Sequence, residues 1–305
     1  MMPIMVTRTD FNRYMMPTYN PASFIPSKAK GSLVWDKKNK KYIDFASGIA
    51  VSSLGHCHPE LNKALVDQSK KMWHLSNVLM NEPAIRLAKI FCKNTFAEKV
   101  FFANSGAEAV EGAIKTARKY AYENISKKKN GIVSFSDAFH GRTMMAIALN
   151  GSERFVKGFG PMPGGIKNHP FNETKNLEKA ITKNTAAVII ELVQGEAGII
   201  KAKKDFIQKI KKLCKENKVL IIVDEVQSGA GRTGTLFAYE QFGVKPDIMC
   251  CAKGIGGGIP IAAVLTTTKI AKSMEIGSHG TTFGGNPLAC AVAEKVMTLL
   301  TKKML

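Results

Sequence analysis

The sequence lacks a disulfide pattern, a signal peptide and a long apolar run, and each absence excludes a class of protein. Six cysteines are spread over 305 residues without a Cys-x-x-Cys pair, which argues against the disulfide framework of a secreted domain. The first residues, MMPIMVTRTDF, have no continuous apolar core of the kind found in a signal peptide. No apolar run approaches the roughly 20 residues that a helix needs to cross a bilayer. We therefore expect a cytoplasmic protein with reduced, mostly buried thiols and no membrane contact.

Acidic residues are scarce: 24 Asp and Glu stand against 44 Lys and Arg, which gives a net charge of +20. The excess is mostly lysine in short runs, such as residues 37–41 and 127–130, with neither interleaved aromatic residues nor a recognisable nucleic-acid-binding module. In the stretch KKDFIQKIKKLCKENK the apolar residues share one helical face, which is typical of a helix that covers a sheet and exposes a solvated basic face. We expect no nucleic-acid partner; the alternative, a basic surface for nucleic acid, would show as DNA binding at low salt.

Apolar runs and helical patterns alternate along the middle of the chain. Continuous runs such as VLIIV and AAVII are typical of strands that are buried on both faces. The predicted strands are residues 100–102, 132–135, 187–191, 219–223, 248–252 and 262–266. The predicted helices include residues 107–122, 177–181 and 205–215. This alternation predicts an α/β fold, with a mostly parallel central sheet and flanking helices, over residues 47–285.

The two ends of the chain differ from this middle. Residues 1–46 are expected to form an irregular arm and a hairpin-like segment, LVWDKKNKKYIDF, that turns at Asp36–Asn39. Residues 286–305 are expected to begin a helix, with Asn286 as the N-cap and Pro287 in the first turn. That helix carries an apolar stripe with no later element to cover it, which favours a chain that is truncated there.

A lysine stands where one predicted strand ends. In DIMCCAKGIGGGIP, Lys253 follows the apolar run Ile248–Ala252 and precedes a turn rich in glycine. It is either a solvated lysine at a strand end or an amine that is kept dry so that it can lose its charge and react as a nucleophile. The residues after the other strands bear on this choice.

Ligands of open parallel sheets bind beyond the carboxyl ends of the strands. One strand is followed by Ser105, Gly106 and Ala107, which open a helix and form either an ordinary N-cap or a cup for phosphate. Phe139 and Arg142 follow the next strand. These two side chains can supply a stacking face and a clamp for a carboxylate, although a lone arginine is more often a surface residue.

Asp224 directly follows the apolar run VLIIV. A carboxylate there needs a positive partner, which is either a cap or salt bridge within the protein or a cation of a ligand. Residues 229–234 spell G-x-G-x-x-G, but the first glycine trails the strand and no acid ends a following strand, so no NAD site is predicted. No P-loop motif occurs. Residues 56–58, His-Cys-His, lack a further ligand at metal-binding spacing, so no metal is predicted.

Four candidate groups together match the requirements of pyridoxal phosphate. A lysine forms an imine with the aldehyde of this cofactor, and an aspartate keeps the ring nitrogen protonated so that the ring can accept electrons. A helix N-terminus neutralises the phosphate, and an aromatic side chain stacks on the ring. The residues therefore predict pyridoxal phosphate as the cofactor.

Six motifs occur in the order and approximate spacing of a known family. They are FASGIAVSSLGHCHP, FFANSGAEAVEGAIKTARKY, FHGRT, VDEVQSGAGRTG, AKGIGGGIPIAAV and HGTTFGGNPLA. From about Tyr14 to its last residue the chain resembles the class III aminotransferases of pyridoxal-phosphate fold type I, which act on ornithine and acetylornithine. The motif FHGR is more similar to the acetylornithine branch than to the ornithine δ-aminotransferase branch.

The resemblance implies a role for each candidate residue. Lys253 is implied as the Schiff-base lysine and later the general acid and base, and Asp224 as the partner of the pyridinium nitrogen. The further cofactor-binding residues that it implies are Ser105, Gly106, Ala107, Phe139, Glu225, Val226, Gln227 and Thr282. Among these, Val226 backs the ring, Gln227 bonds its phenolic oxygen, and Thr282 reaches the phosphate of the other subunit of a homodimer.

Substrate contacts are implied for Arg142, which takes the substrate carboxylate, and for Glu196 and Thr281. The implied reaction moves an amino group from N-acetylornithine to 2-oxoglutarate, in arginine biosynthesis. The chain departs from the family at Leu192, where proline is usual, and in lacking the C-terminal small domain, which covers the substrate cleft and supplies a second arginine. Alternatives are an ornithine or other ω-amino-acid aminotransferase and a truncated, inactive remnant that binds the cofactor.

Overall fold

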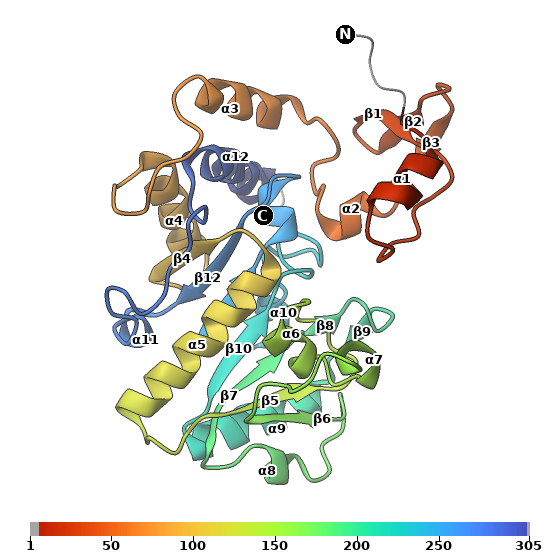
Figure 1. The fold of residues 1–305 in the computed structure, drawn as a ribbon. Coiled ribbons are helices and arrows are strands. Elements are labelled where there is room, and N and C mark those ends of the chain that lie inside the picture. Colours follow the sequence, from red (N-terminus) through yellow and green to blue (C-terminus); the bar gives the residue numbers. More distant parts are fainter. Residues whose placement is uncertain (1–5, 304–305) are drawn as a thin grey trace.

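A seven-stranded sheet runs through the middle of the computed structural model, which describes residues 6–303 (Figure 1). Its strands lie in the order β4, β12, β11, β10, β7, β5, β6. Their bounds are β4 Lys99–Ala103, β5 Gly131–Phe135, β6 Ile166–His169, β7 Thr185–Ile190, β10 Leu220–Asp224, β11 Ile248–Cys251 and β12 Ala262–Thr266. β12 is antiparallel to both of its neighbours, and every other pair is parallel. The predicted α/β fold with a mostly parallel sheet is confirmed.

All six predicted strands are present, and β6 was not predicted. Its sequence, IKNH, is short and mostly polar because it forms an edge of the sheet, where burial on both faces is not required. By contrast, every residue of β7 is buried. Successive residues of β7 face opposite sides of the sheet, so that Ile189 packs in one core cluster and Val188 and Ile190 in another.

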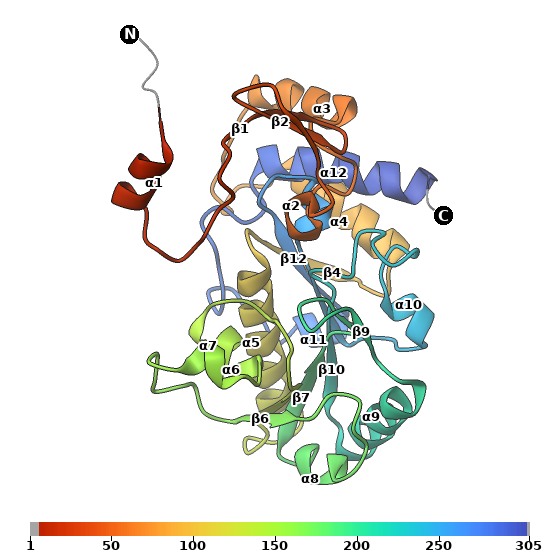
Figure 2. The same ribbon diagram turned by 90° about the vertical axis from the view of Figure 1, so that its right-hand side faces the viewer.

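Helices cover both faces of the sheet (Figure 2). α5 (Gly106–Asn124) packs on one face, and α8 (Leu177–Ala180) and α9 (Lys204–Asn217) pack on the other. In α9 the side chains of Phe206, Ile207, Ile210 and Leu213 are buried, as the amphipathic pattern predicts. The remaining short elements are α6 Met144–Leu149, α7 Glu153–Val156, β8 Val193–Gln194, β9 Ile200–Lys201, α10 Tyr239–Phe242, η1 Lys253–Gly256 and α11 Thr268–Ala271.

The last helix, α12 (Pro287–Lys303), packs against α3 (Pro59–Ser69) and α4 (Glu82–Asn94). Its predicted N-cap is confirmed, because Oδ1 of Asn286 accepts the N–H of Ala289 at 2.8 Å. Its apolar stripe is buried in one cluster with Leu61 of α3 and with Leu87 and Phe91 of α4. The expectation of an uncovered stripe was therefore wrong. The helices that cover α12 end at residues 69 and 94, far before its start at residue 287, and no local pattern links them to it.

The N-terminal segment lies apart from the main sheet, at the upper right of Figure 1. It contains α1 (Arg8–Tyr14), a three-stranded antiparallel sheet of β1 (Pro26–Lys30), β2 (Leu33–Asp36) and β3 (Lys41–Ile43), and α2 (Ser47–Ala50). The predicted hairpin is β2–β3, where Oδ1 of Asp36 accepts the N–H groups of Lys38 and Lys40 at 2.8 and 2.9 Å. α1 and β1 were not predicted, so the arm is less irregular than expected. The division of the chain at residue 46 stays a prediction.

One lysine of the run 127–130 is not solvated. The side chain of Lys129 is 1% exposed, and its Nζ donates hydrogen bonds to the carbonyl oxygens of Lys183 and Asn217 at 3.1 and 2.7 Å. Burial lowers the pKa of Lys129. Lys129 thus joins the segments that precede β5, β7 and β10 at the amino ends of these strands. A run of lysines in the sequence does not show which member has this role.

Within residues 6–303, no helix combines the length and apolarity that crossing a membrane requires.

Candidate active site

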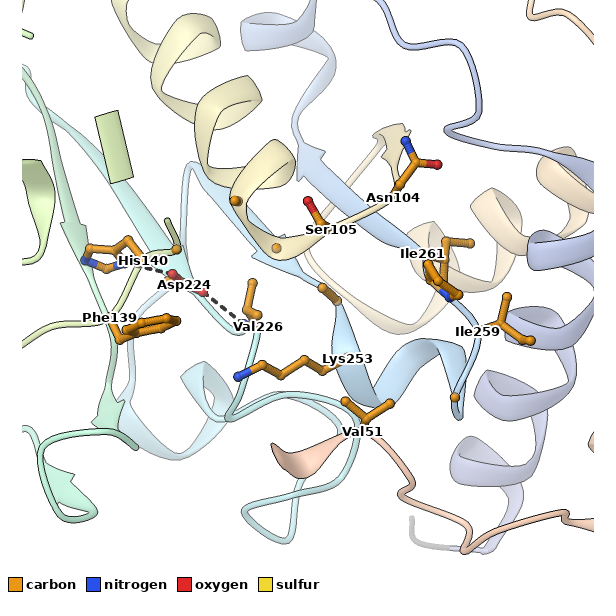
Figure 3. A pocket seen from close by; sticks show the side chains of 16 residues that line it. Val51, Asn104, Ser105, Phe139, His140, Asp224, Val226, Lys253, Ile259 and Ile261 are labelled. Atoms are coloured by element: carbon orange, nitrogen blue, oxygen red, sulfur yellow. Dashed lines mark hydrogen bonds and ion pairs between the residues drawn. The ribbon is translucent and has the colours of Figure 1, made fainter. Parts of the chain in front are cut away.

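A cavity of about 370 Å³ opens at the carboxyl ends of β10 and β11 (Figure 3). Residues at the ends of four different strands line it: residues 104–107 after β4, residues 139–141 after β5, Asp224 and Val226 at the end of β10, and Lys253 after β11. Because parallel strands end at the same edge, four loops far apart in the sequence meet there. The volume suits a small coenzyme.

Lys253 is half-buried and extends into this cavity. Burial lowers the pKa of Lys253, and nearby carboxylates, Asp224 foremost, oppose this shift without cancelling it. A lower pKa increases the fraction of neutral amine, which is the nucleophilic form. The backbone of Lys253 is left-handed, with φ of 46°, a conformation that costs a non-glycine residue about 1–3 kcal/mol and clusters at functional sites.

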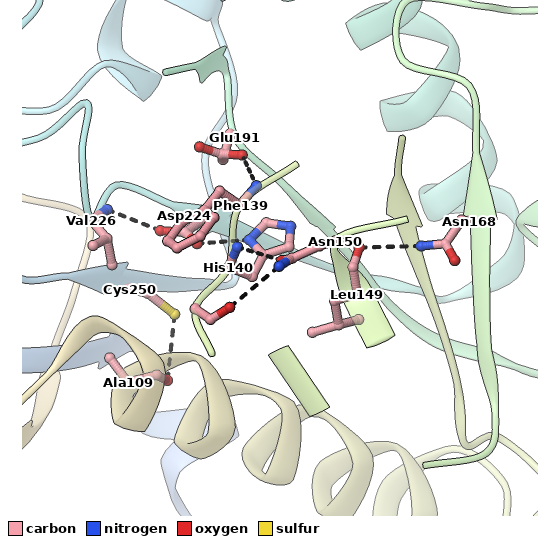
Figure 4. Close-up of polar contacts among 11 residues, drawn as sticks. Ala109, Phe139, His140, Leu149, Asn150, Asn168, Glu191, Asp224, Val226 and Cys250 are labelled. Carbon is pink, nitrogen blue, oxygen red and sulfur yellow. Dashed lines mark hydrogen bonds and ion pairs between the residues drawn. The ribbon is translucent and has the colours of Figure 1, made fainter. Parts of the chain in front are cut away.

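Asp224 ends β10 and is 3% exposed. Its side chain and that of Lys253 line the same cavity, since β10 and β11 are adjacent and parallel. Its Oδ2 accepts a hydrogen bond from Nδ1 of His140 at 2.7 Å, and its Oδ1 accepts the N–H of Val226 at 2.9 Å (Figure 4). The positive partner that a buried carboxylate requires is therefore His140.

His140 is almost fully buried beneath the cavity. Burial acts to lower the pKa of His140, but the hydrogen bond and the charge of Asp224 outweigh it, so that the pKa is raised. The raised pKa favours the protonated imidazole, paired with the carboxylate of Asp224. Nε2 of His140 is buried without a hydrogen-bond partner within residues 6–303. Sequence reasoning did not single out His140, although it stands in the motif FHGRT.

Ser105, Gly106 and Ala107 lie where the 19-residue helix α5 begins, facing the cavity. Ser105 is an N-cap, since its Oγ accepts the N–H of Glu108 at 3.3 Å. A Cβ on Gly106 would lie 2.7 Å from Cγ1 of Val226, so only glycine permits this close approach of the helix to the loop after β10. A helix N-terminus carries about half a positive charge, and its free N–H groups suit an anion such as phosphate.

Phe139 lines the cavity with its ring near Asp224 and Lys253 (Figure 3). Arg142, three residues on, is exposed and does not line the cavity. Its guanidinium lies over two aromatic rings, 5.3 Å from the centroid of Phe139 and 4.5 Å from that of Phe155. These contacts hold the positive charge at the rim, on the side of Phe139.

Gln227 and Glu196 lie beside this cavity and not in it. They line an adjacent cavity of about 350 Å³, where Nε2 of Gln227 donates to Oε1 of Glu196 at 3.0 Å. Thr281 is held near Asn104, whose Nδ2 donates to Oγ1 of Thr281 at 3.2 Å. Thr282 is exposed and does not line the first cavity of its own chain.

Glu225 is not part of the cavity, which corrects the expectation that it binds the cofactor. Its carboxylate accepts hydrogen bonds from Oγ of Ser228 and from the N–H of Tyr239. Burial raises the pKa of Glu225 to about 7. Because consecutive residues at a strand end point in opposite directions, Asp224 faces the cavity and Glu225 faces away from it.

The groups around the cavity fit pyridoxal phosphate on their own chemistry. The start of α5 suits the phosphate, Phe139 and Val226 supply two apolar contacts for a ring, Asp224 offers a buried carboxylate, and Lys253 offers an amine of lowered pKa. Among residues 6–303, no cluster of side chains suited to a metal ion was found.

Comparison with known proteins decides the family. The model of the class III aminotransferases matches residues 14–305. The chain belongs to the class III aminotransferases. It is therefore a transaminase that depends on pyridoxal phosphate and uses a small-molecule amino donor and a keto acid.

Its relatives include an acetylornithine/succinyldiaminopimelate aminotransferase of Buchnera aphidicola, 53% identical over 302 residues, and a succinylornithine transaminase of Yersinia pseudotuberculosis, 51% identical over 309 residues. The alignments cover 99% of this chain and 74% and 75% of those proteins. Among solved structures, the ornithine aminotransferase of Toxoplasma gondii, with pyridoxal phosphate at partial occupancy in its active site, superposes with a TM-score of 0.92 at 34% identity, covering 97% of this chain and 70% of that one.

Proposed function

We propose that this class III aminotransferase transfers the amino group of an N-acylated ornithine, N-acetylornithine first, to 2-oxoglutarate, giving N-acetylglutamate semialdehyde and glutamate in arginine biosynthesis. Relatives above 50% identity that are named for acetylornithine and succinylornithine support the donor class. The observation that carries the proposal is that Lys253 and Asp224 line one cavity together with the start of α5.

Lys253 and Asp224 do the chemical work in this proposal. Bound pyridoxal phosphate supplies an aldehyde that amines attack and a ring that accepts electrons. Lys253 would hold the cofactor covalently through its amine and, once that amine is free again, would accept and return the proton that moves during the transfer. Asp224, which pairs with His140, would balance the charge of the protonated ring nitrogen. Its two oxygens accept one hydrogen bond each within the chain and have lone pairs left for this contact.

The remaining cofactor contacts fix its position. Ser105, Gly106 and Ala107 present the start of α5 to the phosphate, while Phe139 and Val226 lie along the ring. We assign the phenolic oxygen to Gln227 from the family resemblance, which requires its amide to turn from Glu196 toward the first cavity.

Substrate recognition falls to the rim of the site. Arg142 is exposed, is held over Phe139 and Phe155, and can pair with a carboxylate of the donor or acceptor in the bidentate manner of guanidinium groups. Glu196 lines two further cavities, one together with Gln227 and the other together with Phe139. We assign it to the side chain of the incoming substrate. We also assign Thr281 to the substrate, because it lies in the segment before α12 and its Oγ1 contacts Asn104, which lines the first cavity.

A screen of amino donors tests the function. The protein loaded with pyridoxal phosphate is mixed with N-acetylornithine, N-succinylornithine, ornithine or γ-aminobutyrate, and the loss of the cofactor's visible absorbance is followed in a single half-reaction. We expect the acylated ornithines to react about tenfold or more faster than ornithine, because a site built for a neutral amide leaves a free ammonium group unpaired. Faster reaction of ornithine or γ-aminobutyrate would assign the chain to another ω-aminotransferase. An absorbance band that no donor changes would identify an inactive cofactor-binding protein.

We also propose a homodimer whose two active sites share residues. Large apolar side chains of the segment 73–80 are exposed, with Val78 at 87% and Met80 at 90%. This segment lies against the residues before α12, since the rings of His74 and Phe283 are 4.9 Å apart and Nδ2 of Asn77 donates to the carbonyl of Thr281. Exposed apolar side chains gathered in such a patch favour a protein interface. Thr282 is exposed between Thr281 and Phe283, which contact this segment, and does not line the cavity of its own chain, so it can serve a second subunit.

Sedimentation equilibrium tests the dimer. We expect a mass of twice 33.2 kDa for the wild-type chain. Met80→Glu places a charge in the patch and is expected to shift the mass toward the monomer, because an unpaired charge is costly in an apolar interface. Tyr122→Glu, at an exposed position near the end of α5, is the control and leaves the mass unchanged. A wild-type monomer at micromolar concentration contradicts the proposal.

A further inference from the structure

Glu191 is a buried carboxylate next to the site, and the proposed reaction leaves it unused. It directly follows β7, which lies between β10 and β5 in the sheet, and it is 5% exposed. Its Oε2 accepts the backbone N–H of Phe139 at 2.8 Å (Figure 4). Glu191 therefore stands between the end of β10, which carries Asp224, and the loop after β5, which carries Phe139 and His140.

The charged groups around Glu191 come from three other segments. Burial raises the pKa of Glu191 to about 7, with His140 and Lys253 acting to lower it and Asp224 acting to raise it further. In return, the charge of Glu191 acts to raise the pKa of His140 and of Lys253. The charges of Glu191, Asp224, His140 and Lys253 therefore influence one another.

We propose that Glu191 is a positioning residue that fixes Phe139 through its backbone N–H and, by gaining and losing its own proton, adjusts the charge felt by the Asp224–His140 pair and by Lys253. This inference rests on the proposed function of Lys253 and Asp224 as the groups that hold the cofactor. It adds that the protonation of the bound cofactor depends on a carboxylate that is not itself part of the cavity lining.

The direction of the effect depends on the sign of the charge. When Glu191 is ionised, its negative charge stabilises positive charge on the nitrogen that joins Lys253 to the cofactor. When Glu191 gains a proton, as its raised pKa of about 7 allows, this stabilisation is lost. Removing the charge therefore lowers the pH at which that nitrogen loses its proton. A nearby opposite charge raises the pKa of a protonated nitrogen, and its loss lowers that pKa again.

Glu225 provides a matched control within the same chain. It is adjacent to Asp224, is as deeply buried as Glu191, and burial raises its pKa to about 7 as well. Its carboxylate, however, bonds Ser228 and the N–H of Tyr239, away from the cavity. The two residues therefore separate the effect of a buried carboxylate in general from the effect of its contact with Phe139.

The test is a pH titration of the visible absorbance of the holoenzyme. In Glu191→Gln, whose amide oxygen still accepts the N–H of Phe139, we expect the midpoint for the nitrogen at Lys253 to fall by about one pH unit. Glu191→Asp keeps the charge but shortens the side chain, so its midpoint stays closer to that of the wild type while its cofactor affinity falls, because the bond to Phe139 is weakened. Glu225→Gln keeps the wild-type midpoint.

Two results would overturn the inference. One is a wild-type midpoint in Glu191→Gln that has bound the cofactor, and the other is an equal shift in Glu225→Gln. Failure of the proposed function looks different, because the wild-type protein itself then shows no absorbance band that depends on Lys253. Glu191→Asp guards against a folding defect in the glutamine variant, and a bound cofactor in either variant reports a folded site.

Discussion

Replacement of Lys253 by alanine is expected to lower the rate of amino transfer by about 10³-fold or more. The group that moves the proton contributes about 10²–10⁴ by itself, and the alanine variant also loses the covalent bond to the cofactor. The substitution leaves the fold intact, since residue 253 has a left-handed backbone that alanine adopts no less readily than lysine. The rate of the half-reaction with N-acetylornithine measures the loss.

Lys245→Ala is the control for this variant. Lys245 is exposed in the loop before β11, outside the cavity, and its loss is expected to leave the rate unchanged. A small primary amine added to Lys253→Ala should restore part of the activity, because it can carry the proton that the side chain carried. Full activity in the alanine variant without added amine would contradict the role of Lys253.

Replacement of Asp224 by asparagine is expected to lower the rate by about 10²–10³-fold, the usual cost of one preorganised electrostatic contact. The amide keeps the shape of the side chain but cannot balance a proton on the ring nitrogen. It also removes the charge that raises the pKa of His140, so that burial lowers this pKa instead and the imidazole becomes neutral. We therefore expect weaker cofactor binding as well, measured by titration with pyridoxal phosphate.

A half-buried aspartate at the other end of the strands serves as the control for Asp224. Asp247 lies at the amino end of β11, where its Oδ2 accepts the N–H of Ile221 at 2.8 Å. Asp247→Asn perturbs the same sheet at its opposite edge and is expected to alter stability while the affinity for the cofactor stays at the wild-type value. Equal losses of rate and affinity in the two variants would mean that Asp224 acts through the fold and not at the ring.

Much of this site could be predicted from the sequence because its parts follow buried strands. Runs such as VLIIV and AAVII are continuous because β10 and β7 are covered on both faces. In a mostly parallel sheet the residues after such runs converge at one edge. This is why Lys253, Asp224, Gly106 and Phe139 were predicted as one site and line one cavity.

The parts that escaped prediction depend on packing across the sequence. The contact between His140 and Asp224 joins residues 84 positions apart, and it forms only because the loop after β5 folds over the end of β10. Glu225 was misplaced because strand direction, and not its proximity to Asp224 in the chain, decides which side it faces. Lys129 belongs to a run of lysines, and only the structure shows which of them is buried.

The central claim, that pyridoxal phosphate is bound to Lys253, can be measured on the protein directly. Borohydride reduction of the loaded enzyme makes the link to the amine permanent, and mass spectrometry of its proteolytic peptides locates the modified lysine. We predict one modified residue, Lys253, in the peptide that contains AKGIGGGIP. A stable adduct on any other of the lysines, or none at all in a protein that has bound the cofactor, would contradict this claim.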